Sequence, residues 1–265
     1  MTYILLYLAV GALAGVLAGL LGVGGGLVIV PMLTFIFTSQ QMPGPFILHL
    51  ALGTSLASIM FTSISSLRAH HNRGAVNWQV FRRITPGILV GTLIGSWVAA
   101  QLSTRFLKGF FVLFLYYMAV QMLLNAKPKP ARQLPGAGGM FGVGGVIGGV
   151  SSLVGIGGGS MSVPFLVWCN VSLHNAIGTS AAIGFPIALA GAVGYVANGL
   201  VVNSLPSHSI GFVYLPALLG VAVVSVLTAP LGARLAHSLP VQQLKKAFAI
   251  LLVVMGTKML MGIFQ

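Results

Sequence analysis

Long apolar runs, separated by short polar or charged stretches, follow one another along almost the whole chain. A helix rises 1.5 Å per residue, so about 20 apolar residues cross the 30 Å hydrocarbon core of a bilayer. The pattern therefore predicts an all-α polytopic membrane protein. The predicted helices cover about residues 3–21, 26–38, 46–67, 84–101, 106–124, 137–154, 158–169, 175–197, 211–233 and 244–262.

Two glycine-rich segments divide these runs into two sets of five. Residues 22–31 read GVGGGLVIVP and residues 155–164 read GIGGGSMSVP. We call residues 22–26 the first knot and residues 155–159 the second knot. Further matches follow in the same order in both halves: HLALGTS at 49–55 with HNAIGTS at 174–180, Pro86 with Pro216, and Lys108 with Lys245. We predict two repeats, residues 1–124 and 137–265, joined by a linker at 125–136.

The helix that follows each knot is too short to span a bilayer. The runs at 26–38 and 158–169 have 13 and 12 residues, against the 20 or so that a crossing needs. Each repeat is therefore expected to open with a glycine-broken hairpin of a long and a half-length helix, whether re-entrant or made of two tilted crossings. The chain then returns to its starting side, each repeat crosses an odd number of times, and the two repeats are inverted.

The distribution of Lys and Arg supports this inversion. With hairpins, three cations lie on one side (Arg105, Lys108 and Lys258) and ten on the other. The ten are Arg68, Arg73, Arg82, Arg83, Lys127, Lys129, Arg132, Arg234, Lys245 and Lys246. If each knot pair crossed only once, the split would weaken to eight against five. The positive-inside rule favours the hairpins, and it predicts an inner-membrane protein with a cytoplasmic linker and both termini outside.

Composition excludes several classes of function. The chain is 57% apolar and holds 13 Lys and Arg but no Asp or Glu. The cations are scattered at helix ends and do not form a stripe, so no nucleic acid is expected as a partner. A membrane enzyme would need a general base, metal cluster or nucleophile pair, and the six dispersed His and single Cys169 supply none. We expect no enzyme, cofactor or metal, and the positive field favours anions.

The restart of the helix after each knot predicts an anion site. The first N–H groups of a helix are unpaired and carry roughly half a positive charge. Glycine lets a ligand approach this backbone closely, although the glycines could instead serve only tight helix crossing. Inversion brings both restarts toward the middle of the membrane. The candidate residues are Gly24, Gly25 and Gly26 in the first knot and Gly157, Gly158 and Gly159 in the second.

Matched polar residues on the next helices complete the predicted site. The hydroxyls of Ser and Thr offer donors without fixed charge, though they commonly bond their own helix. The histidines could donate to an anion or titrate near neutral pH, or simply mark helix ends. The candidates are Thr54, Ser55, Thr179, Ser180, His49 and His174.

Glycines four residues apart form ridges on several predicted helices, as at Gly11, Gly15 and Gly19, and at Gly87, Gly91 and Gly95. Such ridges allow close helix contact in lipid. Packing within one chain is the simpler interpretation, and a homodimer is a possible second one.

The paired GxGGGxxxVP segments, the stretch GTSAAIGFPIALAGAVGYVANG at 178–199 and the ending PLGARLAHSLPVQQLKKAF resemble the TauE/SafE-type sulfite exporter family. The resemblance covers nearly the whole chain. It implies export or permeation of small anions with sulfur or carboxylate groups, and it places the family's motifs on Gly22–Pro31 and Gly155–Pro164 and on the two Thr-Ser pairs. The absence of acidic residues argues against any coupling scheme that needs a carboxylate.

Together these features predict a transporter that exports a small, sulfite-like anion by alternating access at a midplane site. An anion channel or an importer of the same fold is the alternative. Without carboxylates, which usually carry coupling ions in transporters, a histidine or the substrate would have to carry any coupled proton.

Overall fold

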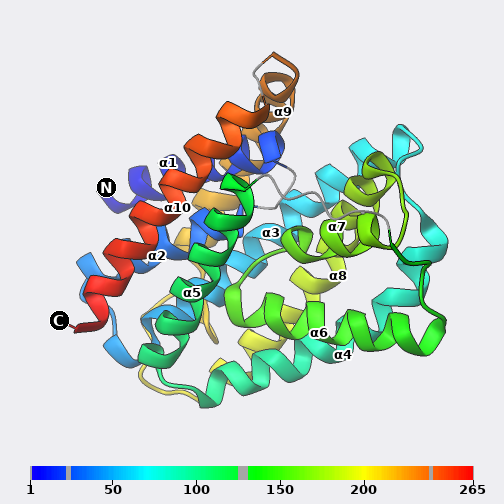
Figure 1. The fold of residues 1–265 in the computed structure, drawn as a ribbon. Coiled ribbons are helices and arrows are strands. Elements are labelled where there is room, and N and C mark those ends of the chain that lie inside the picture. Colours follow the sequence, from blue (N-terminus) through cyan, green and yellow to red (C-terminus); the bar gives the residue numbers. More distant parts are fainter. Residues whose placement is uncertain (1, 22–24, 125–130, 239–240, 265) are drawn as a thin grey trace.

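The computed structural model describes residues 2–21, 25–124, 131–238 and 241–264 (Figure 1). In the first half, these residues form α1 (Thr2–Leu21), α2 (Gly26–Ser39), the short 3-10 helix η1 (Gly44–Phe46), α3 (Ile47–Asn72), α4 (Trp78–Gln101) and α5 (Thr104–Leu123). In the second half they form α6 (Ala137–Val154), α7 (Gly159–Trp168), α8 (Leu173–Gly199), the strands β1 (Ser209–Ile210) and β2 (Val213–Tyr214), α9 (Leu215–Ser238) and α10 (Val241–Phe264).

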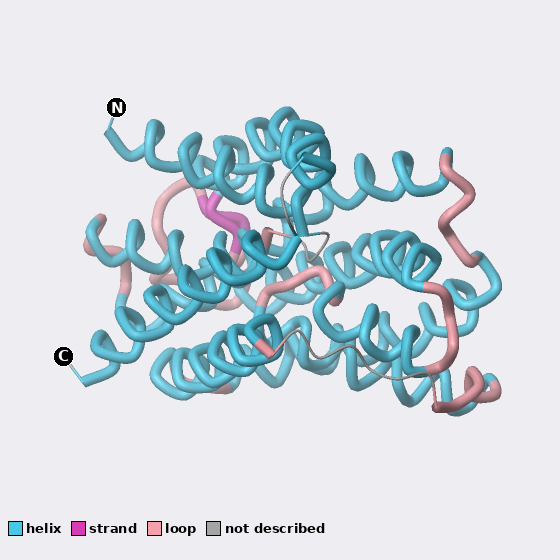
Figure 2. Tube along the Cα trace, turned by 45° about the horizontal axis from the view of Figure 1, so that its top comes forward, coloured by secondary structure: helices cyan, strands magenta, loops and turns pink. Residues whose placement is uncertain are grey.

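Helices dominate the molecule, and the single short hairpin of β1 and β2 stands out among the described residues in Figure 2. Seven of the described helices are long and apolar enough to cross a membrane. The protein is thus an all-α polytopic membrane protein, as the hydrophobic pattern predicts. At 10 residues, α7 is about 15 Å long and cannot span a bilayer alone.

Each half opens with a helical hairpin. At the start of α1, the Tyr3 hydroxyl donates to the Ser39 carbonyl oxygen at the end of α2, over 3.2 Å. Before α6, the N–H groups of Ala131 and Arg132 donate to the carbonyl oxygen of Trp168 at the end of α7, over 3.1 and 3.2 Å. The chain therefore comes back to where it entered in both hairpins, and the expected return is observed twice.

Two faces can be distinguished by what lies on them. The start of α1 and the end of α10 lie at the same end of the molecule (Figure 1), which we call the terminal side. It holds Tyr3 and Ser39. The opposite side, which we call the linker side, holds Arg132 and Trp168. These residues lie just before α6 and at the end of α7, where the two ends of this hairpin meet.

Glycine ridges hold the two halves together. α1 packs along α9, and α4 packs along α6. A Cβ placed on Gly15 would overlap the backbone of Ser225 on α9, and one placed on Gly91 would overlap the backbone of Gly145 on α6. Packing within the chain therefore uses the ridges, and such close backbone approach is the usual source of stability between helices in lipid.

At the centre, α3 packs against α8, and each receives a loop from the other half. The N–H of Tyr214, just before α9, donates to Thr54 Oγ1 on α3 over 3.0 Å. The N–H of Asn77, just before α4, donates to Thr179 Oγ1 on α8 over 2.9 Å. The preceding glycine of each motif, Gly53 or Gly178, leaves room for the loop backbone.

The boundaries differ from the hydropathy pattern where polar chemistry decides them. α4 begins at Trp78, not at residue 84, because the Asn77 side chain accepts hydrogen bonds from the N–H groups of Gln79 and Val80 over 3.1 Å. Such an N-cap starts a helix whatever its hydropathy. The expected start of a helix at 211 is wrong, because residues 209–214 form the β hairpin and α9 begins at Leu215.

Candidate anion site at the second knot

The backbone of the second knot adopts conformations that favour glycine. α6 ends at Gly155, which has φ of 68°. Gly158 has φ of 75° and forms the N-cap of α7. Both lie in the left-handed region, where a side chain is strained and glycine is not. The repeated glycines thus allow the chain to end one helix and start another within a few residues, in the interior of the protein.

The two knots touch. A Cβ placed on Gly26 would overlap the carbonyl oxygen of Gly155 and lie 2.9 Å from the Cα of Ile156. The Ser55 hydroxyl on α3 donates to the same Gly155 oxygen over 2.8 Å. Of the predicted site residues, Gly24 lies outside the described residues. Gly25 and Gly26 are buried at the start of α2, with a Cβ on Gly25 only 3.1 Å from the carbonyl oxygen of Ala14.

The second knot faces the middle of both central helices. A Cβ on Gly157 would meet Ile59, about halfway along α3, at 3.2 Å, and Gly184, about halfway along α8, at 3.8 Å. A Cβ on Gly158 would meet Ile187 and, at 3.5 Å, both Ile147 and the Ser151 hydroxyl. The start of α7 is therefore enclosed by aliphatic side chains about midway along α3 and α8.

Hydroxyl groups without partners lie at this helix start. Ser151 on α6 has 0% and Ser160 on α7 has 5% of its surface exposed. Both Oγ atoms are buried and have no hydrogen-bond partner among the residues that the structure describes. A buried hydroxyl without a partner costs roughly 1–3 kcal/mol, so the two serines are suited to a bound group that would accept from them.

A second pair of hydroxyls also adjoins the first turn of α7. Ser162 Oγ and Ser180 Oγ are 2.6 Å apart, and Ser162 Oγ donates to the carbonyl oxygen of Gly158 over 2.9 Å. Ser180 is a predicted site residue, and the structure brings it to the same helix start as Gly157, Gly158 and Gly159. Sequence reasoning missed Ser151, Ser160 and Ser162. The signal was the difference between the repeats, because GGGSMS at 157–162 stands where the first repeat has GGGLVI.

The matched threonines have structural partners. Thr54 Oγ1 and Thr179 Oγ1 each accept a backbone N–H from a loop of the other half. Both side chains are fully buried. These hydrogen bonds use the threonine oxygens as acceptors, and they give the Gly-Thr pair of each motif a role in docking the loop.

The two histidines lie away from the second knot. His49 Nε2 is 3.0 Å from the carbonyl oxygen of Ala99 at the end of α4, and its ring lies 5.1 Å from that of Phe212. His174 is exposed in the first turn of α8 on the linker side. The structure therefore separates the pair, although they occupy the same position in the two repeats.

Comparisons with known proteins agree with this architecture. The family described as sulfite exporter TauE/SafE matches residues 7–259. The chain belongs to the TauE/SafE family. It is similar to a probable membrane transporter protein of Haemophilus influenzae, with 39% identity over 260 residues that cover 97% of this chain and 98% of the relative.

More distant relatives of this TauE/SafE protein carry the same description. A probable membrane transporter protein of Methanocaldococcus jannaschii is 29% identical over 265 residues, covering 97% of this chain and 95% of the relative. One of Bacillus subtilis, YdhB, is 26% identical over 267 residues, covering 97% and 100%. No solved structure matches the chain significantly. Family and relatives together identify a multi-pass membrane transporter.

In this TauE/SafE protein, cations stay away from the second knot. Neither α6, α7 nor α8 carries Lys or Arg. On the linker side, Arg132 lies over the Trp168 ring at 4.9 Å from its centroid, and Arg68 and Arg73 are exposed. On the terminal side, Lys258 lies 4.9 Å over the Phe35 ring. The positive electrostatic potential that α6, α7 and α8 supply at the second knot thus comes from backbone and hydroxyl dipoles.

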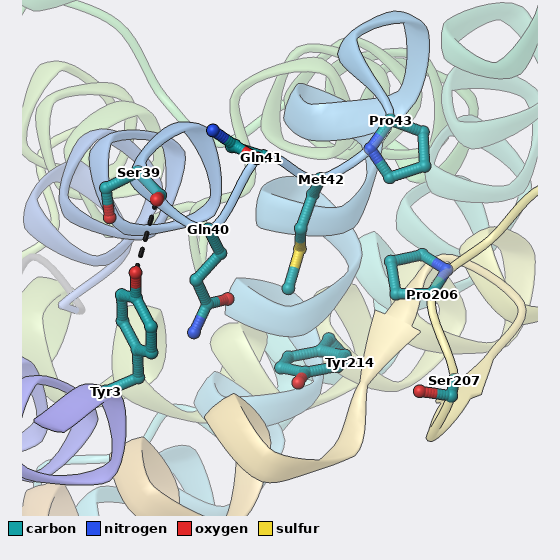
Figure 3. Close-up of a pocket in the computed structure, with 9 residues that line it drawn as sticks. All are labelled: Tyr3, Ser39, Gln40, Gln41, Met42, Pro43, Pro206, Ser207 and Tyr214. Carbon is teal, nitrogen blue, oxygen red and sulfur yellow. Dashed lines mark hydrogen bonds between the residues drawn. The ribbon is translucent and has the colours of Figure 1, made fainter. Parts of the chain in front are cut away.

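An open pocket of about 620 Å³ lies on the terminal side, between the ends of α1 and α2 and the loop before β1. It is lined by Tyr3, Ser39, Gln40, Gln41, Met42, Pro43, Pro206, Ser207 and Tyr214 (Figure 3). None of the predicted site residues lines it. The Tyr214 ring packs edge-on against Phe37 at 5.6 Å and Tyr7 at 6.3 Å, so an aromatic cluster adjoins this pocket.

Proposed function

We propose that the protein exports a small oxyanion of the sulfite type by alternating access to the second knot. The observation that carries the proposal is the start of α7. There the first N–H groups of a broken helix, the hydroxyls of Ser151 and Ser160 without partners among the described residues, and the Ser162–Ser180 pair all adjoin the first turn of α7 and are buried. Peptide N–H groups at a helix start bind anions well.

Two inverted repeats are part of this proposal, and matched contacts support them. α1 with α9 corresponds to α6 with α4, and the Tyr214–Thr54 hydrogen bond corresponds to the Asn77–Thr179 hydrogen bond. Each contact joins one half to the other. Because each half opens with a hairpin and adds three long helices, its ends lie on opposite sides, and the halves run in opposite directions.

Transport by alternating access fits the enclosure of the site. The residues of the second knot are buried, and the aromatic cluster of Tyr7, Phe37 and Tyr214 lies beside the open pocket on the terminal side. We propose that this pocket is the outer vestibule and that the cluster closes it. Inverted repeats permit such a change by rocking one half against the other around a fixed site.

Orientation and direction follow from charge. With the linker side cytoplasmic, ten of the 13 Lys and Arg face the cytoplasm and the termini face outward. The cell interior is negative, so one exported negative charge gains about 2.3 kcal/mol per 100 mV. Export of an anion is therefore downhill without a carboxylate to couple it. Flux that follows a pH gradient for every substrate and ignores voltage would contradict this scheme.

The decisive experiment is counterflow in liposomes with labelled sulfite, competed by sulfate, acetate or a sulfonate. Gly158→Leu should abolish counterflow, because a side chain at the N-cap of α7 would overlap Ile187 and crowd the Ser151 hydroxyl. Gly142→Leu is the matched control, since a Cβ at Gly142 meets nothing within 4 Å. Gly142→Leu should elute as folded protein in detergent, and counterflow by Gly158→Leu is measured on its folded, monodisperse fraction. Normal counterflow by folded Gly158→Leu would refute the site.

Gly25→Leu tests the other knot. A Cβ on Gly25 would already press on Ala14 at 3.0 Å and on Ile29 at 3.3 Å. We expect this variant to lose counterflow together with stability. Planar-bilayer recording with the wild type separates a carrier from an anion channel. Only a channel passes a current large enough to be measured for a single molecule.

A further inference from the structure

We infer that the second knot binds its substrate only as a monoanion, so that an oxyanion with a second ionisable proton is carried with that proton attached. The inference rests on the proposed function and concerns the same site. It assigns Ser151 and Ser160 as substrate ligands and defines the substrate class as singly charged oxyanions.

The donors at the site are all neutral. They comprise the first N–H groups of α7 and the two serine hydroxyls without partners. Ser151 Oγ lies 3.5 Å from the Cβ position of Gly158, the N-cap of α7, so it faces the helix start. The positive end of a helix amounts to roughly half a charge, which suits one negative charge better than two.

The apolar surroundings of the second knot raise the free energy of binding an anion with a second negative charge. Ile59, Ile147 and Ile187 border the knot glycines. The Born cost of moving an ion into such a medium rises with the square of its charge, so a dianion costs about four times as much as a monoanion. A fixed cation could offset this cost, but α2, α6, α7 and α8 carry no Lys or Arg. On α3, Arg68 is exposed near the linker side.

Titratable side chains on the surrounding helices are directed elsewhere. On α3, His49 contacts the Ala99 oxygen, His70 lies in the last turn, and His71 Nδ1 accepts from Trp78 Nε1 over 3.4 Å. On α8, Tyr195 donates to the Ser152 oxygen over 3.0 Å and His174 is exposed. No titratable side chain occurs on α2, α6 or α7. A proton that crosses with the anion is therefore held by the anion itself.

Hydroxyl groups can accommodate that proton. Each serine hydroxyl both donates and accepts, so Ser151 or Ser160 can donate to one oxygen of the substrate and accept the retained O–H of another. No proton is transferred in this scheme. Binding and release leave the substrate in the protonation state in which it arrived, and one negative charge moves per cycle.

The test compares the pH dependence of efflux from liposomes for sulfite, methanesulfonate and sulfate, with protein-free liposomes as the background. Hydrogensulfite loses its proton near neutral pH, methanesulfonate stays a monoanion, and sulfate stays a dianion. We expect sulfite efflux to fall as pH rises, approaching tenfold for each pH unit well above that pKa. Methanesulfonate efflux should stay flat, and sulfate should not move.

Variants connect this profile to the residues. Ser160→Ala and Ser151→Ala should each lower methanesulfonate efflux about tenfold or more, since a hydrogen bond to a charged group is worth about 1.5–3 kcal/mol. Ser152→Ala is the matched control: Ser152 is also buried, but its hydroxyl already donates to the Gly149 oxygen over 2.8 Å. Unchanged efflux in both folded test variants would overturn the assignment of ligands.

The remaining outcomes distinguish failure of the monoanion rule from failure of the proposed function. Sulfite efflux that stays constant or rises with pH, or sulfate efflux as fast as that of methanesulfonate, would overturn the monoanion rule and leave anion transport standing. A parallel fall for sulfite and methanesulfonate would place the titration in the protein and also overturn the rule. Absence of efflux for all three anions would overturn the proposed function and the inference with it.

Discussion

The two glycine knots are nearly the same in sequence and have different surroundings in the structure. Gly26 in the first knot lies against the backbone of Gly155, and Leu27 after it is fully buried in the apolar core. The second knot is followed by Ser160 and preceded on α6 by Ser151, and neither hydroxyl has a hydrogen-bond partner within the described part of the chain. The first knot provides close backbone packing, and the second provides polar groups that are free to bind a ligand.

The difference arises at a few positions of an otherwise matched pair. Leu27 and Ile29 in the first repeat stand where the second has Ser160 and Ser162. In the inverted arrangement that we propose, both helix starts lie at the centre, but a small anion needs only one of them. The repeat thus creates two equivalent places, and side chains make one of them polar. A symmetric backbone does not imply two symmetric sites.

The largest expected effect comes from making the first knot resemble the second. Leu27→Ser removes a fully buried side chain and places a hydroxyl among apolar neighbours. Large-to-small changes in a core cost about 2–5 kcal/mol. We expect a lower thermal unfolding midpoint in detergent and no gain of transport. Enhanced efflux of methanesulfonate in Leu27→Ser would show that the first knot can also bind the anion.

A smaller effect separates packing from binding with one methyl group in each knot. Gly26→Ala must displace the backbone of Gly155 and Ile156, and overpacking of this kind costs roughly 1–3 kcal/mol. Gly157→Ala meets the Ile59 γ-methyl group at 3.2 Å and the Cα of Gly184 at an ordinary 3.8 Å, so a shift of the methyl group by a few tenths of an ångström accommodates it. We expect Gly26→Ala to lower the unfolding midpoint and Gly157→Ala to lower efflux several-fold at an almost unchanged midpoint. The reverse pattern would exchange the roles assigned to the two knots.

The smallest effect concerns Thr54 and Thr179, which accept matching backbone hydrogen bonds in the two halves. Thr54→Val and Thr179→Val each leave one half-buried N–H, of Tyr214 or Asn77, without its acceptor. The cost is about 1–2 kcal/mol in each case. We expect equal shifts of the unfolding midpoint and an unaltered preference among sulfite, sulfate and methanesulfonate. A change of anion preference in either variant would return that threonine to the binding site.

Much of the fold could be predicted from local sequence. The helix at 137–154 was predicted with the boundaries of α6, and the half-length helices at 26–38 and 158–169 agree with α2 and α7 within one residue. An apolar segment in lipid forms a helix, because a helix pairs the N–H and C=O groups of its own backbone where no water is present. The start of α9 was missed because the pairing of β1 with β2 depends on a turn and not on hydropathy.

The candidate site was predictable in part. The knots, Ser55 and Ser180 occur in repeated motifs, and repetition drew attention to them. Ser151, Ser160 and Ser162 were missed because they differ between the repeats. His49 and His174 share a motif position, yet one binds the Ala99 oxygen within the protein and the other is exposed. Which side chains a motif residue meets depends on the partner helix.

The order of residues alone determined that this chain lies in a membrane, that its helices break at two glycine clusters and that it carries no acidic group for coupling. These are local properties, set by hydropathy, by glycine conformation and by composition. Tertiary packing decided that the knots touch, that the threonines dock loops and that serine hydroxyls gather at α7. The first two kinds of contact join residues about a hundred or more positions apart, as between Ser55 and Gly155, and the third joins three different helices, so no short-range pattern encodes them.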